Sequence, residues 1–306
     1  NMRIEGRRRS SNFEDRGRGS GGGRGGVPIR ALTSVVRFLG IKGTLIAGAV
    51  VVVGFFLLPS ELKQQVLGAL SGGGQAGPAA QGAGSVCEAS PGQGKACDFW
   101  RVVLASTEDV WKPLFQRGAL PRYQSAPGAY EEPVLVVFAD SVMTGGCGGA
   151  RSGEGPYYCP GDKKLYIDPA FYDVMEKRLR APGDFAQAYV IAHEVGHHVQ
   201  NLIGSNDSKA DGDTKNQSSV RVELQADCFA GVWGHTARAS LEITDEDLEE
   251  AMAAAHAIGD DTLGHSNVRD YTHGTSAQRK RWFRRGFDSG DARRCDTFAI
   301  AKYAEL

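Results

Sequence analysis

The spacing of hydrophobic positions divides the chain into a polar start, one continuous apolar run and an amphipathic remainder. Residues 1–26 are rich in Arg, Gly and Ser with almost no large apolar side chains, so they cannot bury enough surface to offset the entropy of ordering. We expect residues 1–37 to form a disordered basic tail. Residues 71–94 have a flexible Gly, Ala, Gln, Ser and Pro composition, and we expect a linker over residues 59–96.

From about residue 97 the pattern becomes that of a folded domain, long enough to bury a core. Residues 98–118 carry apolar side chains at helical spacing, with Pro113 expected to bend this helix or to begin a new first turn. Asp184 and Gly204 are the expected caps of the next helix. The helices predicted after the first span residues 185–202, about 218–238, 244–258 and 276–287.

Two short β-branched runs, residues 133–139 and 164–168, predict strands on either side of a Gly-rich loop that Cys147 and Cys159 bracket. No internal repeat is evident. The sequence therefore predicts an α+β domain over residues 97–306, in which a small sheet accompanies a mainly helical array.

The apolar run at residues 43–58 is uncharged and is extended to residue 38 if Lys42 snorkels towards lipid headgroups. This length overlaps that of a buried core helix. A cleaved signal peptide is a further alternative, but the preceding segment is very long and no small-residue cleavage site follows the run. We expect one uncleaved transmembrane helix over residues 38–58.

Charge is distributed unevenly on the two sides of this run. Residues 1–42 carry nine Arg and one Lys against three acids, about +7, so the chain's net charge of −1 leaves about −8 for the rest. The positive-inside rule then predicts a single-pass cell-membrane protein with a cytoplasmic N-terminus and a periplasmic or extracellular domain. Arg/Gly segments also bind RNA, but only Phe13 can stack on a base, so we expect no nucleic-acid partner.

The six cysteines all follow the apolar run, and an even count there is typical of an oxidising compartment. The absence of any C-x-x-C motif argues against a zinc ribbon or a thioredoxin-like site. Six cysteines allow 15 pairings. Short-loop pairing of Cys87 with Cys97 and of Cys147 with Cys159 would leave Cys228 for Cys295.

The segment His193-Glu194-Val195-Gly196-His197 carries the strongest chemical signal. Positions i and i+4 of a helix lie one above the other, so the two imidazoles can share a tetrahedral Zn²⁺. Glu194 lies on the adjacent flank, where it can act as general base towards a metal-activated water. The alternative is a helix that carries two surface histidines without a metal. The helix face around them is otherwise apolar, so unpaired imidazoles there would be costly to bury. The motif also arises by chance in only roughly one such chain in a hundred.

A catalytic zinc site has three protein ligands and an open position. Gln200 and Ile203 stand where metzincins have Gly and His, so that class is excluded. We expect Glu223, on the following helix, to be the third ligand. Asp227 lies one turn later on the same face and can accept a hydrogen bond from a ligating histidine. A solvated helix face is the alternative explanation for these two acids.

Residues 99–295 resemble the bacterial neutral zinc metallopeptidases and, more distantly, the gluzincins. The resemblance is carried by HEVGHHVQ (193–200), ELQADCFAGVW (223–233), IGDD (258–261) and HGTSAQRKRWFRRGF (273–287). It implies a zincin-like fold with a small sheet over the active-site helix and helices below. It adds little about which peptides are cut.

We therefore expect a membrane-anchored zinc-dependent endopeptidase acting on a peptide or protein substrate. One alternative is a catalytically silent binding protein on the same fold, and another is a structural zinc site, although such sites are usually closed by four protein ligands. The sequence does not indicate an oligomeric state.

The remaining histidines have weaker signals. His198 points about 100° from the ligand face, so we expect it near the ligands or at the surface. His273 and Tyr271 lie in DYTHGTS, just before a predicted helix, and either is a candidate donor to the oxyanion of the reaction. A loop histidine that caps the next helix is the alternative for His273. Three more histidines lack a partner at ligand spacing and are expected to be structural: His235, His256 and His265.

Overall fold

The computed structural model describes residues 2–19, 84–121, 128–151, 155–177, 183–257, 259–260 and 270–306, and these belong to one compact unit. The predicted transmembrane helix at residues 38–58 and most of the predicted linker lie outside the described residues. Among the described helices, none has the length and apolarity needed to cross a membrane.

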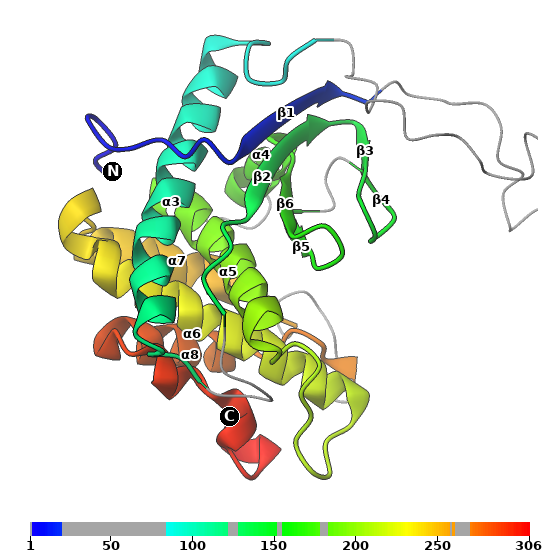
Figure 1. Ribbon diagram of the computed structural model, residues 1–306, viewed down its shortest axis with the longest axis vertical. Helices are drawn as coiled ribbons and strands as arrows, with labels where there is room; N and C mark the ends of the chain where they lie inside the picture. Colours follow the sequence, from blue (N-terminus) through cyan, green and yellow to red (C-terminus); the bar gives the residue numbers. More distant parts are fainter. Residues whose placement is uncertain are drawn as a thin grey trace, which may run out of the picture. The chain divides into compact units, whose positions relative to one another are not determined.

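A four-stranded sheet and a small hairpin form the β part of the unit (Figure 1). In spatial order the sheet contains β1 (Phe13–Arg18), β2 (Val134–Ala139), β6 (Lys164–Ile167) and β5 (Tyr157–Cys159). The first three strands are parallel, and β5 runs antiparallel to β6. The hairpin pairs β3 (Ser141–Met143) with β4 (Gly149–Arg151). Both predicted strands are confirmed as β2 and β6.

The N-terminal segment was predicted to be disordered, and for residues 2–19 this is wrong. Phe13 pairs with Leu135 in a parallel ladder that continues to Arg18 opposite Ala139. Met2, Ile4 and Phe13 pack against the core, and backbone and polar side-chain bonds hold the rest of the segment; for example, the Ser10 hydroxyl donates to Glu108 at 2.5 Å. A composition-based argument counts only apolar surface, so it missed this source of order.

The first helix, α3 (Pro91–Gln116), begins inside the predicted linker. Ser90 is its N-cap, with a hydroxyl that accepts the N–H of Gln93, and a proline follows at the first helical position, where its missing N–H costs nothing. Folded structure after the apolar run is therefore already present at Pro91, before the predicted domain boundary at residue 97. The helix also continues past Pro113 to its end at Gln116.

The four later predicted helices are all present, and each agrees with its expected range to within a few residues. Gly204 caps the helix that carries the metal motif in the left-handed conformation, as expected, but its N-cap is Gly183 rather than Asp184. These helices are α5 (Asp184–Ile203), α6 (Lys215–Leu241), α7 (Asp245–Ala257) and α8 (Ser276–Ser289). The shorter elements are α4 (Ala170–Lys177) and 3-10 helices at Ala292–Cys295, Thr297–Ala299 and Tyr303–Glu305.

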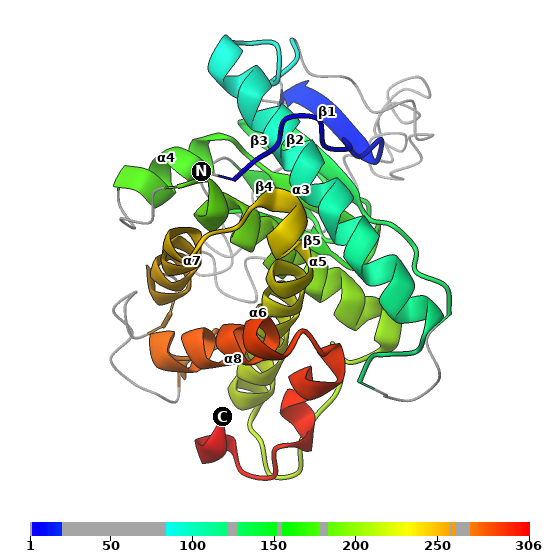
Figure 2. The same cartoon turned by 90° about the vertical axis from the view of Figure 1, so that its left-hand side faces the viewer.

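Glycine allows the helices around the site to approach with their backbones in contact. A Cβ on Gly196 would lie 2.9 Å from the carbonyl oxygen of Ala226, so α5 and α6 touch beside the metal motif. A Cβ on Gly286 would lie 1.9 Å from the carbonyl oxygen of Cys228, where α8 lies across α6 (Figure 2). These two crossings bring side chains of three helices to one point.

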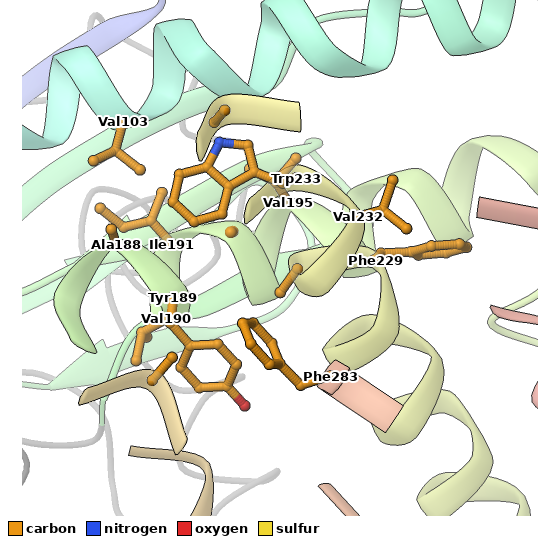
Figure 3. Close-up of a cluster of buried hydrophobic side chains, with 14 of the residues drawn as sticks. Val103, Ala188, Tyr189, Val190, Ile191, Val195, Phe229, Val232, Trp233 and Phe283 are labelled. Atoms are coloured by element: carbon orange, nitrogen blue, oxygen red, sulfur yellow. The ribbon is translucent and has the colours of Figure 1, made fainter. Parts of the chain in front are cut away.

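Apolar side chains fill the space behind α5. Figure 3 shows Ile191, Val195 and Trp233 gathered in this core, with the Tyr189 and Phe283 rings packed edge to face at 5.4 Å. All six cysteines form disulfides, and the short-loop pairing scheme is confirmed: Cys87–Cys97, Cys147–Cys159 and Cys228–Cys295.

Candidate metal centre

The two histidines of the motif lie one turn apart on α5. Their ring centroids are 4.7 Å apart and the ring planes are nearly perpendicular. His193 is only 5% exposed, and His197 is partly buried. The four-residue spacing and the helical backbone are sufficient to direct both rings to the same side.

Glu223 reaches this side from α6, in agreement with its expected position. Its carboxylate oxygens lie 3.2 Å from His193 Nε2 and 3.4 Å from His197 Nε2. Zinc bonds of about 2.0–2.2 Å at the tetrahedral angle place neighbouring ligand atoms roughly 3.3–3.6 Å apart, so these separations fit one shared ion. No other group of three potential metal ligands converges in this way within the described part of the chain.

Each imidazole also makes a hydrogen bond through Nδ1, the ring nitrogen that does not face Glu223. Nδ1 of His193 lies 2.8 Å from Asp227 Oδ1, and Nδ1 of His197 lies 2.8 Å from Gln200 Oε1. Both partners accept hydrogen bonds, so Nδ1 of each ring carries a proton, and Nε2, which faces Glu223, is the nitrogen left to bind a metal. The position of Asp227 agrees with the expected hydrogen bond to one of the two histidines. The part played by Gln200 was not predicted.

Asp227 is the centre of a fully buried polar cluster. Arg279 of α8 donates to both of its carboxylate oxygens at 2.9 Å, and the Tyr189 hydroxyl donates to Oδ1 at 2.5 Å. Burial acts to raise the pKa of Asp227, but the charges of Arg279 and His193 outweigh it and the pKa is lowered. A buried ion pair is tolerated when its hydrogen bonds are satisfied, which is the case here.

Neither Arg279 nor Tyr189 was identified from the sequence. Tyr189 stands four residues before His193, so helical spacing could have placed it beside the ligands. Arg279 is one of several basic residues in its segment, and no local pattern distinguishes it from those exposed to solvent.

Glu194, the predicted base, is 9% exposed and lies beside the ligand group on α5. Burial raises its pKa, while the charges of His197 and His193 and a bond from the backbone N–H of Tyr158 oppose the rise. A carboxylate with a raised pKa holds a proton more readily near neutral pH, as a general base must during its cycle. Tyr158 belongs to β5, so the edge of the sheet contacts the base directly.

His198 is buried beneath the site. Its Nε2 donates to the carbonyl oxygen of Glu131 at 2.6 Å, and its Nδ1 accepts from the Tyr158 hydroxyl at 2.9 Å. Burial lowers the pKa of His198 to about 4, so the ring is neutral at physiological pH. Asn201 donates to the same hydroxyl. His198 therefore fixes the edge strand against α5.

The ligand group and Glu194 lie in the wall of a cleft of about 580 Å³. Most of the lining is apolar or aromatic and comes from the β5 region, α4, α5 and α6. Its non-ligand members include Pro156, Tyr157, Phe171, Tyr189, Val190 and Val222. Such a cleft is suited to an apolar side chain presented next to the metal position.

Of the two candidate oxyanion donors, the structure brings only one to this cleft. His273 lines it and is half exposed, with Nδ1 lying 3.2 Å from Asp260 Oδ1. Tyr271 is 7% exposed, packs in the hydrophobic core and is not among the described residues that line the cleft. Of the other histidines, His235 contacts the carbonyl of Phe287, His256 is exposed and His265 lies outside the described residues.

Comparison with known proteins gives relatives along nearly the whole chain. "Uncharacterized protein YpfJ" of Escherichia coli (strain K12) is 43% identical over 311 residues, which cover 97% of this chain and 99% of that protein. "Uncharacterized protein Rv2575" of Mycobacterium tuberculosis is 42% identical over 213 residues, covering 64% and 68%. No solved structure matches. A family profile matches residues 2–298, and the chain belongs to this family, described as "Putative neutral zinc metallopeptidase".

Proposed function

We propose that the protein is a zinc-dependent endopeptidase. The observation that carries this proposal is the convergence of ligand atoms of His193, His197 and Glu223 within 4.8 Å of one another, with Glu194 beside them in the same cleft. Three ligands leave one position open, which is typical of catalytic rather than structural zinc sites.

When bound, zinc supplies Lewis acidity, which polarises a carbonyl group and lowers the pKa of water. His193, His197 and Glu223 would hold it. Glu194 accepts the proton of the attacking water and passes it to the leaving nitrogen. The backbone N–H of Tyr158 keeps the Glu194 carboxylate in place during both transfers.

The residues that hydrogen-bond the two histidines determine which ring nitrogen carries the proton. Asp227 and Gln200 keep the proton of each ligating histidine on Nδ1, so Nε2 stays available to the metal. Arg279 balances the charge of Asp227, and both side chains are buried. We assign donation to the developing oxyanion to His273, because it lines the cleft and Asp260 orients its ring.

We further propose that the domain acts outside the cytoplasm, anchored through residues 38–58. Three disulfides in the domain support an oxidising compartment, because cytosolic thiols are kept reduced.

Metal analysis combined with a turnover assay tests the proposed function. The purified protein should contain about one zinc ion, cleave members of a quenched fluorescent peptide library, lose activity with a chelator and regain it with zinc. Bound zinc without turnover of any peptide would favour a silent binding protein. Absence of zinc binding would contradict the metal centre itself.

A further inference from the structure

Strand β1 makes residues 13–18 part of the same folded unit as the metal motif. Its residues pair with β2 from Phe13 opposite Leu135 to Arg18 opposite Ala139, and the N–H of Gly19 donates to the Ala139 carbonyl. Hydrogen-bonded strands lie about 4.8 Å apart, whereas the hydrocarbon core of a bilayer is about 30 Å thick. The two strands must therefore be in the same compartment.

Buried polar contacts attach the residues before β1 to α3. The Glu108 carboxylate, only 2% exposed, accepts hydrogen bonds from Arg8, Ser10 and Asn12. A buried carboxylate without these partners would be costly, so the helix and the N-terminal segment depend on each other.

A second group of contacts joins β1 to the first described residues beyond the apolar run. The Asp15 carboxylate accepts the backbone N–H groups of Val86 and Cys87 and the hydroxyl of Ser85. Both ends of the intervening chain are therefore tied to one another at β1.

Several arginines that make the N-terminus basic are used in this attachment. Six of the nine arginines in residues 1–42 precede residue 19. Four of the six form ion pairs: Arg3 with Glu242, Arg8 with Glu108 and Asp109, Arg9 with Asp98, and Arg16 with Glu14. The positive-inside rule treats such residues as a retention signal, but here three of them, Arg3, Arg8 and Arg9, pair with acids outside the N-terminal segment.

We infer that residues 2–19 lie on the same side of the membrane as the peptidase domain, outside the cytoplasm. A single crossing of the membrane between residue 19 and residue 84 is incompatible with this arrangement. This arrangement replaces the cytoplasmic N-terminus expected from charge alone, and it does not depend on the proposed catalytic activity.

Single introduced thiols test the arrangement in the full-length protein. All native cysteines are in disulfides, so Ser11→Cys, at an exposed position before β1, provides one reactive thiol. Ala239→Cys, at an exposed position of α6, is the matched control. A membrane-impermeant maleimide added to intact spheroplasts should label both variants to the same extent before and after lysis. Labelling of Ala239→Cys alone before lysis, or of neither variant, would overturn the inference.

Exchanging the charges of one ion pair tests independently whether the N-terminal segment is attached to the domain in protein purified from cells. Arg9 donates to both carboxylate oxygens of Asp98 at the domain surface. In full-length protein purified from membranes, Arg9→Glu should lower the melting temperature by roughly 2–4 °C, and adding Asp98→Arg should restore most of it. If the double variant melts no higher than Arg9→Glu, the N-terminal segment is not seated on the domain and the inference fails.

Discussion

Asp227 and Gln200 hydrogen-bond the Nδ1 atoms of His193 and His197. Among the described residues, the partners of Glu223 are these two imidazoles and the more distant Arg279. Because of this difference, substitutions of Glu223 and Asp227 should affect zinc binding to different degrees. We expect Glu223→Ala to lose most bound zinc at neutral pH, because a ligand is removed. Asp227→Asn should retain zinc with roughly 10–100-fold weaker affinity.

Competition against a chelator of known affinity measures the zinc dissociation constant of each variant. Thermal unfolding is recorded in parallel, because Asp227→Asn also removes the buried negative charge beside the Arg279 guanidinium and should cost roughly 3–5 kcal/mol of stability. Complete loss of zinc from Asp227→Asn together with normal binding by Glu223→Ala would overturn the ligand assignment.

His198 gives the protein a specific dependence of stability on pH. Its folded pKa of about 4 lies below the ordinary value of 6.5, so the unfolded state binds more protons between these pH values. The stability that the neutral ring contributes is complete above pH 6.5 and is lost as the pH falls towards 4, by up to roughly 3 kcal/mol.

Urea unfolding of metal-free protein across this pH range measures the loss. His198→Gln should be less stable than the wild type at pH 7.5, but its stability should fall less between pH 6.5 and 4. If the free energy of unfolding fell equally with pH in the two proteins, His198 would not be the neutral buried histidine that we assign.

The crossing of α6 and α8 determines whether Arg279 reaches Asp227. Gly286 has no room for a side chain, since a Cβ would meet the Cys228 carbonyl at 1.9 Å and backbone atoms would have to move. We expect Gly286→Ala to destabilise the fold by about 3 kcal/mol or more, at the upper end of overpacking effects, and to weaken zinc binding.

Gly92→Ala is a matched control near the start of α3, where the closest atom to the new Cβ is 3.9 Å away. Its stability should lie within roughly 1 kcal/mol of the wild type, on the stabilising side. Equal melting temperatures for Gly286→Ala and the wild type would show that the two helices do not touch.

The three disulfides constrain the unfolded chain to different degrees. Cys228–Cys295 closes 67 residues and links α6 to the C-terminal 3-10 helices, whereas Cys87–Cys97 closes 10. In the chain-entropy treatment this difference corresponds to about 1.7 kcal/mol. Replacing both cysteines of the longer loop with Ala should therefore lower the free energy of unfolding more than the same change in the shorter loop. The reverse order, measured by urea titration, would contradict this.

The sequence was most informative where one local pattern determined the structure. The helical spacing of apolar residues, together with residues typical of helix ends, located α5, α6 and α8. The four-residue spacing of His193 and His197 likewise predicted that their rings lie on one side of the helix. Prediction failed where order depends on contacts between distant segments. Strand β1 is stabilised by partners on α3 and β2, and Arg279 reaches the site only because glycines allow two helices to cross closely.

Composition alone was misleading for residues 2–19 and for the start of α3. Gly- and Arg-rich chain has little apolar surface to bury, yet here hydrogen bonds to Glu108 and the ladder to β2 provide the order. A buried acid on a predicted helix, such as Glu108, is the signal that could have pointed to a basic partner segment.

The central claim is that Glu194 transfers protons beside a metal held by three residues of α5 and α6. Glu194→Gln removes the base while keeping the size of the side chain, and it leaves His193, His197 and Glu223 unchanged. We expect this variant to bind zinc and melt like the wild type, and to hydrolyse peptides at least roughly 100-fold more slowly. Wild-type turnover by zinc-loaded Glu194→Gln, purified free of contaminating peptidases, would contradict the proposed mechanism.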